Sequence, residues 1–240
     1  MTGPSDLEHA YALAEGFVDT GRYAEAGRLI AGLLSRDPQP DLERLRAMLA
    51  AAVEASDDAA ARLNLALVLL HEDSDASDAD FEFAVSLLQD ATDLVEDPHS
   101  PQHSATLAGL AHGLLGDAAV SGRGVDADPE AGFRHYHLAA EYGNAKAALN
   151  VGLALDGGML DQPVDKTAAA HFYRIAADAG EPRAMTNLAL LYLNDLEPPD
   201  EVTVLDLLER ARDLGDRNAQ DVLDALYRDT LGDFGGDEDG

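Results

Sequence analysis

Apolar residues recur every three or four positions along most of this chain, which is the period of an amphipathic helix. Near the N-terminus, Leu7, Tyr11, Ala14 and Phe17 follow this spacing, and a second run of the same kind ends before Pro38. No stretch shows the sustained alternation of apolar and polar residues that marks a half-buried strand. The pattern therefore predicts an all-α protein.

The same spacing predicts further helices over residues 41–54, 81–97 and 216–228. Asp128 followed by Pro129 has the composition of a helix start, because an acidic side chain caps the first turn and proline suits the first helical position. With the helices between these segments, the pattern predicts about twelve helices joined by short turns.

A short motif that is rich in alanine and ends in glycine recurs in the C-terminal half. Its three copies end at Gly143, Gly180 and Gly215, at spacings of 37 and 35 residues. A repeat of this length is typical of stacked helical hairpins, each of which buries its apolar face only against its neighbours. Such solenoids present long surfaces to partners, and most are not enzymes.

Two parts of the sequence resemble known helical repeats. Residues 10–38 resemble a tetratricopeptide repeat, with Leu13-Ala14 at its Leu-Gly pair, a small residue at Ala26 and a closing Pro38. Residues 115–125, LGDAAVSGRGV, resemble the Leu-Gly-x-x-Tyr-x-x-Gly-x-Gly-Val element of the related Sel-one-like repeats.

Later parts of the chain continue the Sel-one-like pattern. A second copy includes Gly152, Gly158 and Tyr173. A third copy keeps Tyr192 but has residues 196–199, LEPP, in place of the glycine loop.

The resemblance implies a right-handed α-α superhelix, that is, a solenoid. Tetratricopeptide-like hairpins would occupy residues 1–98 and Sel-one-like repeats residues 103–228, and we expect the acidic, glycine-rich residues 229–240 to be disordered. The resemblance also implies a non-catalytic scaffold or adaptor. A peptide or protein partner would dock on the concave surface formed by the first helices of successive hairpins.

The charge balance changes this picture in one respect. The chain carries 46 acidic and 16 basic residues, a formal net charge of −30, and no concentrated basic face, which argues against direct nucleic-acid binding. A basic protein is the natural electrostatic complement, so the alternative function is an acidic inhibitor or immunity-type protein that masks a basic toxin or nucleic-acid-binding protein. The same charge also fits simple solubility or a compositional bias, and the sequence leaves these explanations open.

Two basic residues and two asparagines form the candidate partner-binding site. Lys146 precedes Asn150 by four residues, and Arg183 precedes Asn187 by four, at the same register of consecutive hairpins. In the tetratricopeptide family, such pairs can clamp a terminal carboxylate through charge-assisted hydrogen bonds. Asparagine at this position is also frequent for a structural reason, since it can satisfy backbone groups between hairpins.

The clamp pattern does not extend to other repeats. Val222 occupies the asparagine position of the next repeat, and Asn64 matches that position in the N-terminal half but has Ala60 in place of the cation.

The sequence predicts no cofactor or metal site. The acidic segment 72–82 suggests calcium, but a loop that starts at Asp73 has Asp78 instead of glycine at its sixth place and Ala84 instead of glutamate at its twelfth. Gly122-x-Gly124 lacks the third glycine and the preceding strand of a nucleotide-binding loop.

Other catalytic and targeting signals are also missing. The pairs His99/His103 and His135/His137 have poor spacing for a metal, and the chain has no cysteine. We therefore expect a protein that is not an enzyme. Because no signal peptide or membrane-length apolar stretch is visible, we expect a soluble cytoplasmic location without membrane contact.

Overall fold

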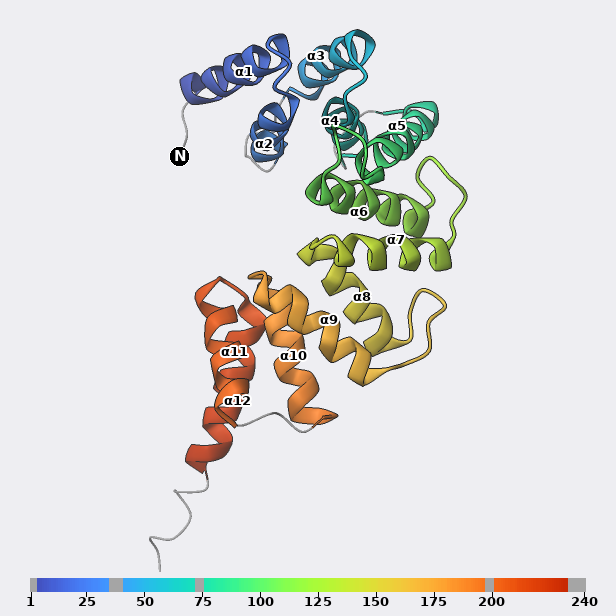
Figure 1. Ribbon diagram of the computed structural model, residues 1–240. Helices are drawn as coiled ribbons and strands as arrows, with labels where there is room; N and C mark the ends of the chain where they lie inside the picture. The colour runs from blue at the N-terminus through green and yellow to red at the C-terminus, as the bar shows by residue number, and fades with distance from the viewer. Residues whose placement is uncertain (1–3, 35–40, 72–75, 197–200, 233–240) are drawn as a thin grey trace, which may run out of the picture. The chain divides into compact units, whose positions relative to one another are not determined.

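The computed structural model describes residues 4–34, 41–71, 76–196 and 201–232. In these ranges the chain forms twelve α-helices and no strand (Figure 1). The predicted fold class, an α-α solenoid, is confirmed. Residues 35–40, 72–75, 197–200 and 233–240 lie outside the described part. They include Pro38, the first four residues of the acidic segment 72–82 and most of the tail, residues 229–240, that we expect to be disordered.

The helices belong to two compact units, residues 1–143 and residues 144–240. The division between the units therefore falls within the predicted Sel-one-like region. The predicted boundary near residue 98 is of another kind, since it separates tetratricopeptide-like from Sel-one-like repeats, and it stays a prediction. Unit 1 contains α1 (Pro4–Asp19), α2 (Tyr23–Leu34), α3 (Leu42–Ala55), α4 (Ala59–Leu69), α5 (Asp78–Glu96), α6 (Ala105–Ser121) and α7 (Pro129–Glu141). Unit 2 contains α8 (Ala145–Gly157), α9 (Lys166–Asp178), α10 (Pro182–Asn194), α11 (Glu201–Asp213) and α12 (Arg217–Gly232).

Each helix of unit 1 packs on the next one along the chain, apart from α2 and α3, and alternate helices such as α2 and α4 also touch. This neighbour-on-neighbour packing is the solenoid arrangement that the repeat period predicts. The core combines many alanines, which let helices approach closely, with a few large side chains. The largest fully buried side chains of unit 1 include Ile30, Leu33, Leu45, Leu49, Leu65 and Leu88.

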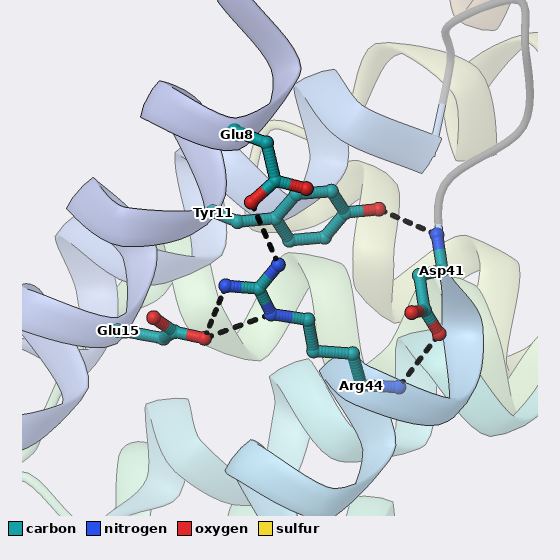
Figure 2. Close-up of polar contacts among 5 residues, drawn as sticks. All are labelled: Glu8, Tyr11, Glu15, Asp41 and Arg44. Atoms are coloured by element: carbon teal, nitrogen blue, oxygen red, sulfur yellow. Dashed lines mark hydrogen bonds and ion pairs between the residues drawn. The ribbon is translucent and has the colours of Figure 1, made fainter. Parts of the chain in front are cut away.

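A polar network joins α1 to α3 at the N-terminal end of unit 1 (Figure 2). The guanidinium group of Arg44 donates to Glu15 at 2.8–2.9 Å and to Glu8 at 3.2 Å, and lies 4.7 Å from the ring centroid of Tyr11. The Tyr11 hydroxyl accepts a hydrogen bond from the backbone N–H of Asp41, the residue that caps α3. These directional polar contacts hold α1 against α3, in addition to the apolar packing between the two helices.

A glycine–tyrosine contact recurs in the Sel-one-like region of both units. In unit 1, the ring of Tyr136 on α7 covers Gly116 of α6; in unit 2, the ring of Tyr173 on α9 covers Gly152 of α8. Each tyrosine hydroxyl donates to a carboxylate of the covered helix, at 2.7 Å for Tyr136 and 3.1 Å for Tyr173. The missing Cβ is what lets the ring lie against the backbone.

Helix ends follow the sequence signals with small shifts. Asp128 caps α7 through its carboxylate, as predicted, and Gly143, Gly180 and Gly215 each adopt a positive φ just after a helix. α5 begins at Asp78, three residues before the predicted start, because the side chains of Ser77 and Asp80 form a reciprocal capping box. α12 continues to Gly232, four residues past its predicted end.

Candidate functional site

The four predicted site residues all belong to unit 2, on α8 and α10. Lys146 and Arg183 are each the second residue of their helix and are exposed, whereas Asn150 and Asn187 lie one turn further on and are half-buried. The predicted register is therefore present, with a cation and an amide repeated on the first helix of two consecutive hairpins. In the part of the chain that the structure describes, neither cation belongs to an ion pair.

Asn187 is held by the helix that precedes it. Its side chain hydrogen-bonds the hydroxyl of Tyr173, which in turn donates to Asp156 Oδ2. Asp156 accepts from the Lys166 ammonium at 2.6 Å through its other oxygen. Burial and the charge of Asp156 raise the pKa of Tyr173, so the hydroxyl stays protonated at physiological pH. Sequence reasoning identified Asn187 but missed this support, because it depends on how α9 rotates against α8 and α10.

The two helix starts differ in how their backbone N–H groups are satisfied. Asn144 caps α8 by accepting from Ala147 N at 3.1 Å. Glu181 occupies the corresponding position of α10 but makes no side-chain cap hydrogen bond. A helix start carries a partial positive charge, to which Lys146 and Arg183 add a full charge at each site. The arrangement is electrostatically suited to an anionic group.

Asn64, the third asparagine at this register, has a different role. It is buried in unit 1, where its amide nitrogen donates to the carbonyl of Tyr23 at 2.8 Å and its side chain lies against Gly27. This is the structural use of the asparagine position that the sequence left open.

An acidic pocket lies in unit 1 where the first turn of α5 meets the loop after α6. Its volume is about 440 Å³, and its lining includes the carboxylates of Asp78, Glu82 and Asp126 together with Gly122 and Gly124. Gly124 has a φ of +75°, and a Cβ there would come within 2.3 Å of the Phe81 carbonyl oxygen. Gly124 therefore allows the loop after α6 to lie directly against the backbone of α5.

Among the described residues, no three histidine or acidic side chains are arranged to hold a metal ion. Across those same ranges, no helix combines the length and apolar character needed to span a bilayer.

Comparison with known proteins agrees with the repeat pattern. The Sel1 repeat model matches residues 110–144, 145–181 and 182–216. The crystal structure of a Sel1 repeat protein from Oxalobacter formigenes is similar with a TM-score of 0.61 at 20% identity, over 91% of this chain and 90% of that one. That of c5321, a protective antigen in uropathogenic Escherichia coli strains with an SLR fold, has a TM-score of 0.47 at 18% identity, over 93% and 57% of the two chains. No curated protein matches significantly.

The three matched segments coincide with the hairpins α6–α7, α8–α9 and α10–α11, and the third is matched although it lacks the glycine loop. The Oxalobacter structure extends the shared fold over nine-tenths of the chain. The chain therefore contains three Sel1-like repeats, over residues 110–216, within an α-α solenoid.

Proposed function

We propose that this protein is a non-catalytic interaction scaffold whose second unit binds the terminal carboxylate of a peptide or protein partner through Lys146, Asn150, Arg183 and Asn187. Sel1 repeat proteins are generally protein-interaction scaffolds. The single observation that carries the finer proposal is the repetition of an exposed cation and a half-buried amide, at the same register, on α8 and α10.

The position of the two cations supports binding more than stability. A cation in the first turn of a helix opposes the helix dipole and costs about 0.3–1 kcal/mol. Lys146 and Arg183 both occupy this unfavourable position, in a chain with only 16 basic residues. A bound carboxylate would turn the cost into a gain, because it would accept charge-assisted hydrogen bonds from the cations and face the positive ends of the helices.

The amides would orient this carboxylate. One hydrogen of the Asn187 amide is directed to the Tyr173 hydroxyl, which Asp156 and Lys166 hold in place. The second amide hydrogen then has a fixed direction and would be available to a ligand oxygen. Because the donor is held before binding, little side-chain entropy would be lost on association.

The test is a comparison of two peptide libraries of the same composition, one with free C-terminal carboxylates and one with C-terminal amides. We expect the protein to enrich peptides from the first library, and the double variant Lys146→Ala/Arg183→Ala to bind them about 10- to 100-fold more weakly, as the loss of charged hydrogen bonds predicts. The control is Arg134→Ala, which removes an exposed cation from unit 1. Equal enrichment of amidated peptides would contradict the proposal.

The acidic pocket favours a second function, in which the protein masks a basic partner. Asp78, Glu82 and Asp126 surround a space large enough for an arginine or lysine side chain, on a protein of net charge −30. In this case arginine-rich peptides would bind with an affinity that falls steeply with salt, and Asp78→Asn/Glu82→Gln/Asp126→Asn would weaken them. Binding that is insensitive both to salt and to the triple substitution would exclude the masking function.

A further inference from the structure

A chain of hydrogen bonds crosses unit 1 from α5 to the end of α7. The Tyr142 hydroxyl and the Nε2 atom of His112 both lie 2.9 Å from Oε1 of Glu96. The Nδ1 atoms of His112 and His135 lie 3.0 Å apart. His112 is buried and its ring stacks on that of Tyr142, at 6.1 Å between centroids, whereas His135 is half-buried. The cluster thus joins three consecutive helices through polar groups.

The protons of this chain can be assigned from its geometry. The Glu96 carboxylate only accepts, so His112 carries a proton on Nε2 and Tyr142 donates its hydroxyl proton. The contact between the two Nδ1 atoms needs one proton and one lone pair. With both rings neutral, His135 donates from Nδ1 and His112 accepts. One added proton can be accommodated, because a His112 ring protonated on both nitrogens, beside Glu96, donates from Nδ1 to an unprotonated Nδ1 of His135. A second proton, on Nδ1 of His135, leaves a proton on both facing nitrogens and turns the hydrogen bond into a repulsion.

The surrounding groups determine how readily the second proton binds. Burial lowers the pKa of His135, and the neighbouring charges of His112 and Arg134 lower it further, against the opposing effect of Glu96. Burial also opposes ionisation of Glu96, but the hydrogen bonds from His112 and Tyr142 outweigh it and lower the carboxyl pKa. Glu96 and, to a smaller extent, burial and Glu141 raise the pKa of Tyr142. Glu96 and Tyr142 therefore keep their charge states between pH 5 and pH 8, and the histidines are what changes.

We propose that the His112–His135 pair is a pH-sensitive contact between α6 and α7, which holds the first Sel1 repeat together near neutral pH and is lost when both rings are protonated. The direction of the pH dependence follows from the difference in proton binding between the folded and the unfolded state. In the unfolded chain, His135 takes up a proton with a histidine pKa of about 6.5. The folded state keeps the ring neutral to a lower pH than this. Unfolding or local opening therefore takes up protons, so stability falls as the pH decreases from about 7 towards 5.

The repeat that would open is specific. The contact lies within residues 110–144, where α7 covers one face of α6, for example with the ring of Tyr136 on Gly116. Local opening of α7 would expose this face without requiring unit 1 to unfold as a whole. The device is independent of the carboxylate site proposed on α8 and α10, so either proposal can fail alone.

The test is amide hydrogen exchange of the full chain at pH 7.5 and pH 5.5, corrected for the intrinsic exchange rates. We expect the protection of α6 and α7 amides to fall by up to about tenfold on acidification, because opening lets His135 take up a proton with the unfolded-state histidine pKa of about 6.5. His135→Asn keeps an amide donor near the position of Nδ1 but does not titrate, so its protection should change less than about twofold for the same reason. His99→Asn removes a highly exposed histidine from the same unit and should behave like the unaltered protein.

Two results would overturn the proposal. One is an unaltered protein whose α6 and α7 keep their protection at pH 5.5; the other is a His135→Asn variant that loses as much protection as the unaltered protein. A second measurement covers the case in which the variant does not fold. In an NMR titration of the unaltered protein, the His135 ring should take up its proton below the usual histidine pKa of about 6.5. Protonation of His135 at or above pH 6.5 would refute the proposal.

Discussion

Gly152 of α8 lies directly against the ring of Tyr173 of α9. A Cβ atom at Gly152 would come within 2.5 Å of Tyr173 Cδ1, closer than carbon atoms approach without displacement. The ring cannot easily move away, because Tyr173 is fully buried and its hydroxyl donates to Asp156. The absence of one methyl group at residue 152 is therefore what allows these two helices to pack closely.

Gly152→Ala should destabilise the protein by about 1–2 kcal/mol. The cost of overpacking, about 1–3 kcal/mol, exceeds the gain of up to about 1 kcal/mol in helix propensity. Urea unfolding measures the difference. Gly32→Ala is the matched control, because a Cβ at Gly32 of α2 meets no atom within 4 Å. That control should gain up to about 1 kcal/mol, and a shift of both variants in the same direction would contradict the packing argument.

Thr186→Val should cost about 1–3 kcal/mol. The buried hydroxyl of Thr186 on α10 donates to Asp216 Oδ2 at 2.6 Å, so valine leaves a carboxylate without one of its donors. Thr92→Val is the control, because the hydroxyl of Thr92 donates only to the carbonyl of Leu88 within its own helix. Equal losses of stability in the two variants would show that the link from α10 to Asp216 contributes nothing.

Alkaline pH should destabilise unit 2 through Tyr173. Burial and the charge of Asp156 raise its pKa, so above pH 10 the unfolded chain loses a proton that the folded state keeps. Fewer protons are bound in the unfolded state, and stability falls by about 1.4 kcal/mol per pH unit. Tyr173→Phe should remove this part of the slope in urea unfolding between pH 9 and pH 11, whereas Tyr227→Phe, at an exposed position, should leave it. An unchanged slope in Tyr173→Phe would refute the assignment.

Lys146→Glu should separate stability from binding. Reversing the charge in the first turn of α8 favours the helix dipole and should raise the stability of unit 2 by about 0.5 kcal/mol. The same change places a negative charge in the proposed carboxylate site and should abolish peptide binding. Thermal unfolding and fluorescence anisotropy measure the two effects. A variant that is less stable and still binds would contradict both parts of the proposal.

The sequence predicted the elements of this fold better than their contacts. Asp128-Pro129 at the start of α7 and the glycines after α7, α9 and α11 are local signals, and local backbone chemistry decides them. The start of α5 was misplaced because Ser77 and Asp80, which cap it, lay inside an acidic run that reads as loop.

The polar clusters between helices could not be predicted. His112 and His135 are 23 residues apart, and only the rotation of α6 against α7 brings their rings together. Sequence reasoning paired His135 with His137 instead, since it could compare only neighbours along one helix. The support of Asn187 by Tyr173 was missed for the same reason, although the register of Asn187 itself was visible in the repeat.

The glycine–tyrosine contact has a consequence for how such genes can change in length. At the corresponding register of the third repeat, the chain has Ala189 and Leu208, both fully buried, in place of Gly152 and Tyr173. A larger residue on the first helix thus accompanies a smaller one on the second. A single helix moved between repeats would pack against a helix with side chains of the wrong size, whereas a complete hairpin keeps its two matched helices together. Recombination that duplicates or deletes repeats in this lineage is therefore expected to break the gene between hairpins and not within them.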